Sequence, residues 1–276
     1  MKFLKIFSWI IFIGLFLGCN EIPIKLADPE IPDSDRTVLI EELTGVSCTN
    51  CPKGALAVEN ILSQYPGRVV VVGIHGVLLS QPVKDASKYD FRNPDAHDLE
   101  LSFPNLWGKP AASVNRSADS NGDIVDIIPD RWLGKVEAEL QKPHVLNIVL
   151  ETQFDRTSRQ LQVEIAAIPL VDLPDNYKIS VYLIESGIVD AQADGGEIIP
   201  NYVHNHVMMD MLTDFDGDVF GSDLKKGEIY KKKYNSVFPV VDGLWDPDQM
   251  EVVVMIAKDS VGDKSVLQAA SAHVVE

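Results

Sequence analysis

The 276-residue sequence has few basic residues and very few cysteines. It holds 24 Lys and Arg residues against 41 Asp and Glu residues, a formal net charge of -17. Binding to nucleic acid depends on cations that neutralise phosphates, so this balance excludes an ordinary nucleic-acid-binding protein. The acidity says little else about partners, because net charge also keeps proteins soluble. Hydrophobic residues make up 46% of the chain, which is enough for a core and excludes wholesale disorder.

The apolar run at the N-terminus is too short for a transmembrane helix. Ile6–Leu17 follows a basic start and has the length of a secretory signal. It ends in Leu15–Cys19, which resembles the lipobox of bacterial lipoproteins, although Phe16 stands where leucine is usual. The resemblance implies a signal peptide over residues 1–18 and a lipid on Cys19. An ordinary secretory signal with an incidental cysteine is the alternative, and in both cases the mature chain leaves the cytoplasm.

The cysteine count fits such a destination. If Cys19 carries lipid, Cys48 and Cys51 are the two remaining thiols of the three in the sequence. In an oxidising compartment this pair rests as a disulfide unless a partner reduces it. Residues 19–36 are polar and dotted with proline, which predicts an extended tether between the lipid and the folded part.

A β-branched run, a Cys-x-x-Cys motif and a helical pattern follow one another in the sequence. Thr37–Leu43 predicts a core strand, and the helical period after the motif ends at Pro66. This order is the redox-site pattern of thioredoxin-like domains. A sulfur next to the unpaired N–H groups of a helix start is stabilised as a thiolate. Cys48 is therefore the expected nucleophile and Cys51 the resolving cysteine, with an inert structural disulfide or two reduced thiols as the alternative.

Two further residues complete the predicted redox site. Resemblance to thioredoxins implies that Glu42, six positions before Cys48, accepts a proton from the second cysteine. A buried carboxyl suits this task because burial raises its pKa, whereas an exposed acid on an edge strand is the alternative. Pro110 matches the cis-proline that faces the cysteine pair in thioredoxin-like folds, with Pro104 as a weaker competitor. An ordinary edge-strand proline is the alternative for Pro110.

The periodicity of the sequence changes near His144. Before it, the second core strand Arg68–His75 makes a βαβ unit with the first, and helices are expected at Ala96–Leu101 and Asp130–Gln141. After it, short β-branched or alternating runs predict strands at Val145–Leu150, Leu161–Ile168, Ile179–Ile184, Ile229–Phe238, Val252–Ala257 and Val266–Val275. The predicted fold is an α/β thioredoxin-like domain over residues 37–142, followed by an all-β, immunoglobulin-like sandwich over residues 143–276.

Three histidines are candidate ligands. His75 ends its strand at the rim where such folds place their sites, so it either contacts the cysteine pair or simply ends the strand. His204 and His206 share one face if they lie on a strand, a spacing that can hold a transition metal. Two polar residues on a solvent face are the favoured interpretation. We expect no metal and no cofactor, and metal capture by the cysteine pair with His75 is the weakest functional hypothesis.

Several segments taken jointly resemble the outer membrane protein 28 family of Bacteroidetes lipoproteins. They are Glu41–Gly45, Cys48–Pro52, Tyr89–Arg92, Pro110 with Val114–Arg116, and Asn201–Val207. The resemblance spans nearly the whole mature chain. It implies an outer-membrane lipoprotein, on the periplasmic or the surface face, with a thioredoxin-like and a β-sandwich domain. An adhesin or surface-receptor role has been proposed for some members.

The expected function is thiol–disulfide exchange on extracytoplasmic proteins, with the membrane reached through the lipid on Cys19. Ser47 stands where thioredoxins carry tryptophan, and Thr49-Asn50 replaces their Gly-Pro, so their redox potential and substrate groove do not transfer. The alternative is a surface adhesin or binding module in which the Cys48–Cys51 bond is a passive staple.

Overall fold

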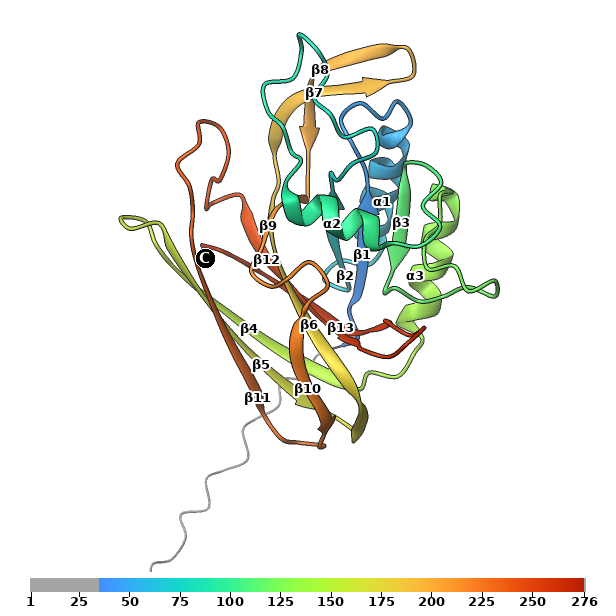
Figure 1. The fold of residues 1–276 in the computed structure, drawn as a ribbon, viewed down its shortest axis with the longest axis vertical. Coiled ribbons are helices and arrows are strands. Elements are labelled where there is room, and N and C mark those ends of the chain that lie inside the picture. Colours follow the sequence, from blue (N-terminus) through green and yellow to red (C-terminus); the bar gives the residue numbers. More distant parts are fainter. Residues whose placement is uncertain (1–34, 276) are drawn as a thin grey trace, which may run out of the picture. The chain divides into compact units, whose positions relative to one another are not determined.

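The computed structural model describes residues 35–275, which lie within one compact unit (Figure 1). The expected signal peptide, the lipid-bearing Cys19 and nearly all of the expected tether lie outside the described residues. Among the helices of residues 35–275, none has both the length and the apolar character needed to cross a membrane.

Strands predominate in the described chain. The helices are α1 (Cys51–Gln64), α2 (Pro94–Ser102) and α3 (Trp132–Leu140), with a 3-10 turn at Pro129–Arg131. The strands are β1 (Val38–Leu43), β2 (Val69–Ile74), β3 (Ala111–Val114), β4 (Leu146–Asp155), β5 (Gln160–Pro169), β6 (Leu173–Glu185), β7 (Ile188–Asp194), β8 (Glu197–His204), β9 (Val207–Met211), β10 (Asp218–Leu224), β11 (Tyr230–Val237), β12 (Met250–Lys258) and β13 (Val266–His273).

One mixed sheet joins strands from both halves of the chain. Its order is β13-β12-β6-β9-β2-β1-β3, with β10 also paired to β6. β1 and β2 are parallel, with α1 between them in sequence, which confirms the predicted βαβ unit. β9 continues the sheet beside β2 through the pair Gly73 and Val207. The expected domain boundary at residues 142–143 therefore falls within a chain whose two halves share a sheet, and the two-domain division stays a prediction.

Alternation along β1 decides which side chains face which helix. Val38 and Ile40 pack with residues of α1 and α3 in one hydrophobic cluster, whereas Leu39 and Leu43 pack with residues of α2 on the other face. Glu42 therefore points to the side of α1 and α3. The β-branched residues of β1 and β2 suit this position because both faces of these strands are buried.

A second sheet, β11-β5-β4, packs over the β6, β10 and β12 part of the mixed sheet. Alternate residues of β5, namely Leu161, Val163 and Ile165, fill the core between the sheets. The six strands predicted after residue 144 are present, as are the two predicted helices. The sequence did not predict β7, β10 or the pairing of β7 with β8.

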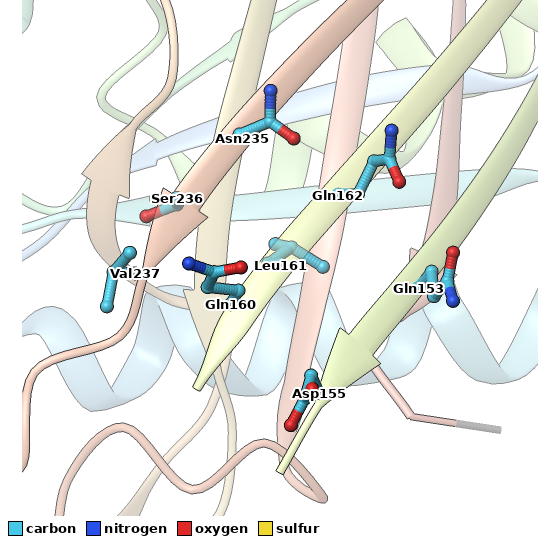
Figure 2. A pocket seen from close by; sticks show the side chains of 8 residues that line it. All are labelled: Gln153, Asp155, Gln160, Leu161, Gln162, Asn235, Ser236 and Val237. Carbon is cyan, nitrogen blue, oxygen red and sulfur yellow. The ribbon is translucent and has the colours of Figure 1, made fainter. Parts of the chain in front are cut away.

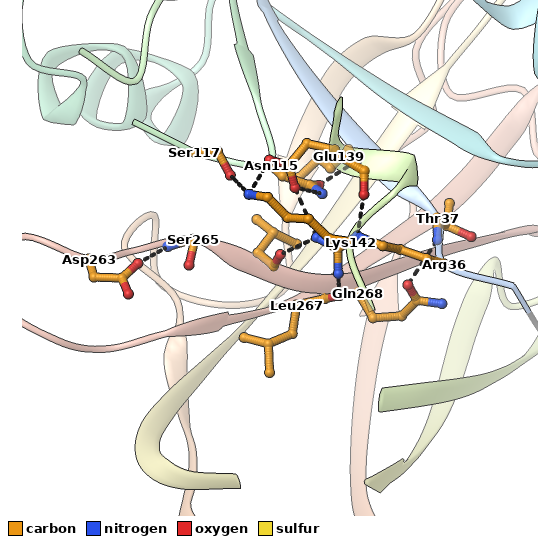
Figure 3. A network of polar contacts seen from close by, with 12 residues as sticks. Arg36, Thr37, Asn115, Ser117, Glu139, Lys142, Asp263, Ser265, Leu267 and Gln268 are labelled. Atoms are coloured by element: carbon orange, nitrogen blue, oxygen red, sulfur yellow. Dashed lines mark hydrogen bonds and ion pairs between the residues drawn. The ribbon is translucent and has the colours of Figure 1, made fainter. Parts of the chain in front are cut away.

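A buried polar network ties α3 to β13 (Figure 3). The Arg36 guanidinium donates to the Glu139 carboxylate at 2.9 Å and to the Leu267 carbonyl at 2.8 Å. Asn115 donates to the same carboxylate at 3.1 Å and accepts from the Leu39 N–H at 2.8 Å. Arg36 and Glu139 are 6% and 4% exposed. A buried charge must be paired, so breaking this network is costly. The network therefore links α3, in the first half of the chain, to β13 in the second half.

Candidate functional site

Cys48 and Cys51 form a disulfide at the start of α1. Cys51 is the first residue of the helix, and its N–H donates to the Cys48 carbonyl at 3.2 Å. Pro52 follows in the first turn, where the lack of an N–H removes no helical hydrogen bond. The position of the pair just before and at the helix start confirms the strand–motif–helix order predicted from the sequence.

Pro110 and Glu42 meet the first turns of α1. The Lys109–Pro110 peptide bond is cis, as predicted, and residues 35–275 contain no other cis peptide bond. A Cβ built on Gly54 would lie 2.7 Å from Pro110 Cβ and 2.8 Å from Glu42 Oε1. The absent side chain at Gly54 therefore lets the helix, the proline and the carboxyl come together one turn after Cys51.

Glu42 lies on an interior strand and is 6% exposed. The alternative of an exposed acid on an edge strand is therefore wrong. Burial raises the pKa of its carboxyl to about 8, with a further rise from the Glu59 charge and an opposing effect of Lys109. Glu42 Oε1 has no hydrogen-bond partner among the described residues. At neutral pH this carboxyl is largely protonated.

Glu41 takes the opposite face of β1, as its alternation with Glu42 predicts. Arg116 binds it with two donors, at 2.8 Å and 2.6 Å, and the Tyr182 hydroxyl donates to it at 3.0 Å. The Glu41 carboxylate is therefore fully paired, which leaves Glu42 as the carboxyl of this strand that is free for proton exchange.

A buried ion pair, not expected from the sequence, holds the residue before Pro110. The Lys109 ammonium donates to the Glu100 carboxylate at 2.6 Å, to the Thr44 carbonyl at 2.7 Å and to Ser80 Oγ at 3.0 Å. Burial lowers the pKa of Lys109, and Glu100 opposes that shift. Three acceptors match the three donors of the ammonium, so the proline loop is anchored to α2 and to the end of β1.

The β7–β8 hairpin lies against the cysteine loop. The Ala193 N–H donates to the Val46 carbonyl at 2.8 Å, and the Gly195 N–H donates to the Thr49 carbonyl at 2.9 Å. In Figure 1 the hairpin lies at the same end of the molecule as the start of α1. The Gly195-Gly196 pair between two short segments was the sequence signal for this hairpin, but that signal does not identify what the hairpin covers.

The side chain of Gln192 completes this cover. Its amide donates to the Cys48 carbonyl at 3.0 Å and to the Gly45 carbonyl at 3.3 Å. Cys48 is 1% exposed and Cys51 is 2% exposed. The disulfide is therefore closed to a protein partner in this conformation, which the sequence analysis did not anticipate.

A cavity of about 390 Å³ opens beside the disulfide. Its wall comes from β1, α1, the end of β2 and the β7–β8 hairpin: Glu42, Thr44, Cys51, Pro52, Ala55, Leu56, Glu59, His75, Gln192, Tyr202, Val203, His204 and Asn205. Cys51 belongs to this wall and Cys48 does not. The structure thus brings Glu42, Cys51 and His75 to one cavity.

His75 and His204 are buried on that wall, with their ring centroids 6.3 Å apart. Burial lowers the pKa of His75 to about 3, with further lowering from His204 and Lys109. Burial likewise lowers the pKa of His204 to about 4, against backbone hydrogen bonds that raise it. His75 Nδ1 and His204 Nε2 have no hydrogen-bond partner among residues 35–275. Both rings are therefore neutral and each presents an unpaired nitrogen.

The interpretation of His204 and His206 as neighbours on a solvent-facing strand is wrong. β8 ends at His204, which is 5% exposed, and His206 has a positive φ of 57° in the turn before β9. The left-handed turn breaks the alternation on which the shared face depended. Within the described residues, no group of three or more His, Cys, Asp or Glu side chains is arranged to hold a metal ion.

A larger cavity, about 570 Å³, lies away from the disulfide on β4, β5 and β11 (Figure 2). Figure 2 shows Gln153, Gln162 and Asn235 across its three strands. The pairing register places Gln162 opposite both Gln153 and Asn235. Its wall of amides, a hydroxyl and one carboxylate offers hydrogen bonds but holds no histidine, cysteine or cationic side chain.

Fold and site together define a strand-rich protein whose mixed sheet presents a Cys-x-x-Cys disulfide at a helix start. A sequence model of the family described as Outer membrane protein Omp28 matches residues 101–276. The chain therefore belongs to the Omp28 outer membrane protein family, as the sequence motifs predicted, and this membership supports association with the outer membrane. The match begins after the cysteine pair, so it carries no information on that pair.

Two solved structures are similar in fold over most of the chain, and a third matches about half of it. HBP35 of Porphyromonas gingivalis is 14% identical, with 87% of this chain and 76% of that chain covered and a TM-score of 0.67. A protein from Agrobacterium tumefaciens is 13% identical, with coverage of 88% and 96% and a TM-score of 0.55. A domain of the outer membrane lipoprotein Omp28 from Porphyromonas gingivalis is 15% identical over 48% of this chain and 90% of that chain, with a TM-score of 0.32. No curated protein sequence matches the chain.

Proposed function

We propose that this chain is a lipid-anchored outer-membrane protein that carries out thiol–disulfide exchange on extracytoplasmic proteins. Cys48 is the attacking sulfur and Cys51 resolves the mixed disulfide. Glu42 exchanges a proton with Cys51, and Pro110 shapes the surface beside the pair. Lipid on Cys19 holds the protein at the membrane, and neither nucleic acid nor a bound cofactor takes part.

The main support for this proposal is the close approach of Pro110 and Glu42 to Gly54. Pro110 and the unpaired Glu42 oxygen both lie within 3 Å of a Cβ built there, one turn after Cys51. A disulfide held only for stability needs no buried, unpaired carboxyl beside it. Parallel β1 and β2, the disulfide at α1 and the cis-proline before β3 are together typical of a thioredoxin-like domain. We infer such a domain over residues 37–142 and an immunoglobulin-like sandwich after it.

Glu42 supplies the proton that exchange requires. When the disulfide is reduced, Cys51 leaves as a thiolate, and the neutral Glu42 carboxyl can protonate it. In the opposite direction the carboxylate takes the proton from the Cys51 thiol. A pKa of about 8 suits both directions, because it lies close to the pH at which thiols ionise.

Access for a protein client requires the β7–β8 hairpin to move from the cysteine loop. The hairpin contacts that loop through two backbone hydrogen bonds, through the Gln192 amide and through a hydrophobic cluster that holds Ile188 and Val46. Each such bond contributes roughly 0.5–1.5 kcal/mol net, so local opening lies within reach of ordinary fluctuations. The covered disulfide is then a resting state and the opened one reacts with clients.

Trapping of mixed disulfides tests the proposal. The full-length lipoprotein with Cys51→Ala should retain covalent adducts of envelope proteins that dithiothreitol releases, because the resolving sulfur is gone. Cys48→Ala is the matched control and should retain far fewer. If Cys51→Ala forms no adduct and its Cys48 thiol titrates with an ordinary pKa, the exchange function is refuted.

The second candidate function is a surface adhesin or binding module with a structural disulfide. The observation in its favour is the near-complete burial of Cys48 and Cys51 beneath the hairpin. On this hypothesis the double Cys→Ala variant loses stability but keeps partner binding, and neither single variant traps a client.

A further inference from the structure

Three side chains on the wall of the cavity beside Cys51 each carry a buried polar atom that has no partner among residues 35–275. These atoms are Glu42 Oε1, His75 Nδ1 and His204 Nε2, on side chains that are 6%, 3% and 5% exposed. Buried polar groups in folded proteins are almost always hydrogen-bonded, and three exceptions on one wall call for an explanation. A volume of about 390 Å³ is in the range of small-molecule sites. These features point to a small polar ligand.

The wall accepts hydrogen bonds and carries negative charge. In each histidine the other nitrogen makes a backbone hydrogen bond, so the unpaired nitrogen of the neutral ring offers a lone pair. Glu59 adds an acidic side chain, whereas the buried Glu42 carboxyl is largely neutral at pH 7. No lysine or arginine lines the cavity, and the nearby Lys109 ammonium is held by three acceptors of its own. The cavity therefore favours an ammonium group over a neutral or anionic one.

The disulfide forms part of the same wall through Cys51. The Cys48 side is covered by the Gln192 amide and by the hairpin backbone. A small molecule in the cavity thus lies against Cys51 while the hairpin stays in place. Attack at Cys51 expels Cys48, the sulfur that the Cys-x-x-Cys pattern at a helix start predicts to be the better leaving group.

We propose that the cavity admits a small cationic thiol, with an ammonium group a few atoms from its sulfur, which exchanges with the Cys48–Cys51 disulfide. This inference rests on the proposed exchange function and adds a class of substrate to it. The ammonium binds among Glu59, Glu42 and the two imidazole nitrogens, and the sulfur faces Cys51.

The exchange balances in two steps. The thiolate of one small molecule attacks the Cys51 sulfur, a new S–S bond forms there, and the Cys48–Cys51 bond breaks with Cys48 leaving as a thiolate. A second small thiolate attacks the sulfur of the bound small molecule and expels the Cys51 thiolate. Two thiols are thereby oxidised to one small disulfide, and two electrons reduce the protein disulfide. The two protein thiolates take up the protons that the small thiols lost.

Three small thiols that differ in charge test the inference. The oxidised full-length lipoprotein in detergent micelles is mixed with cysteamine, mercaptoethanol or mercaptopropionate, which are cationic, neutral and anionic. Each rate is divided by the thiolate concentration and by the rate on an oxidised Cys-Thr-Asn-Cys peptide. The normalised rate should be about tenfold higher for cysteamine than for mercaptoethanol, the size expected of one well-placed charge pair, and lowest for mercaptopropionate.

A matched pair of variants tests whether the preference for cysteamine comes from the cavity or from the net negative charge of the whole protein. Glu59→Gln and Glu151→Gln change the net charge equally, and both residues are exposed, but Glu59 lines the cavity and Glu151 lies on β4 outside it. Glu59→Gln should remove most of the cysteamine preference and Glu151→Gln should retain it. Loss of the preference in both variants would assign it to the overall field and overturn the inference.

The other outcomes distinguish the two proposals. Equal normalised rates for the three thiols overturn the cationic-thiol inference and leave exchange standing. No native-state reduction by these thiols or by dithiothreitol overturns the exchange function as well. Acid quenching, alkylation and fragment mass analysis should locate the cysteamine adduct on Cys51, and an adduct on Cys48 would refute entry through the cavity.

Discussion

Replacing Glu42 by glutamine should abolish one large pH dependence of stability. The carboxyl titrates at about 8 in the folded protein against an ordinary value of 4.5, because burial disfavours its charged form. Between these values the unfolded chain has lost the proton and the folded protein keeps it. The stabilisation by the neutral carboxyl is therefore complete below about pH 4.5 and is lost as the pH rises through about 8.

The magnitude follows from the pKa shift. Each pH unit in this window costs about 1.4 kcal/mol, so the free energy of unfolding should fall by about 4 kcal/mol from about pH 5 to about pH 8 through Glu42 alone. Glutamine has nearly the same shape and does not titrate. The free energy of unfolding of Glu42→Gln minus that of the wild type should therefore be about 4 kcal/mol larger at about pH 8 than at about pH 5.

Urea unfolding of both oxidised proteins at the two pH values measures this double difference. Contributions of other titrating groups cancel, because they are common to the two proteins. Glu151→Gln, an exposed acid, is the control and should follow the wild type. Parallel pH profiles for wild type and Glu42→Gln would show that the carboxyl is hydrated or paired in solution, and the argument for its proton exchange would fail.

Three further changes follow from the contacts described above. Gly54→Ala brings a Cβ to 2.7 Å from Pro110 Cβ and should cost roughly 1–3 kcal/mol in urea unfolding, whereas Gly134→Ala in α3, with open space around it, should stabilise by about 0.4–1 kcal/mol. Arg36→Met removes one partner of the buried Glu139 carboxylate, which keeps Lys142 and Asn115, and should cost roughly 1–3 kcal/mol by the same assay, whereas Arg156→Met on the surface should leave stability nearly unchanged. Gln192→Ala removes the amide bonds to the cysteine loop and should speed reduction of the disulfide by dithiothreitol several-fold, with Gln160→Ala as the control; an unchanged rate would show that the hairpin does not limit access.

The sequence by itself determined the local part of the candidate site. The apolar runs of β1 and β2, the cysteines at the start of α1 and the stop at Pro66 are local patterns, and the structure reproduces them. Lys109–Pro110 was identifiable because cis bonds are nearly confined to proline. Membership of the Omp28 family followed from short motifs spread along the chain.

Only the tertiary structure decided what lies against that local site. Periodicity tells which face of a strand or helix is buried, but not which distant segment covers it. The hairpin over Cys48, the meeting of His75 with His204, and the pairing of β2 with β9 all join residues more than a hundred positions apart. These contacts turn an open Cys-x-x-Cys motif into a covered disulfide beside a polar cavity, because long-range packing fixes both exposure and charge environment.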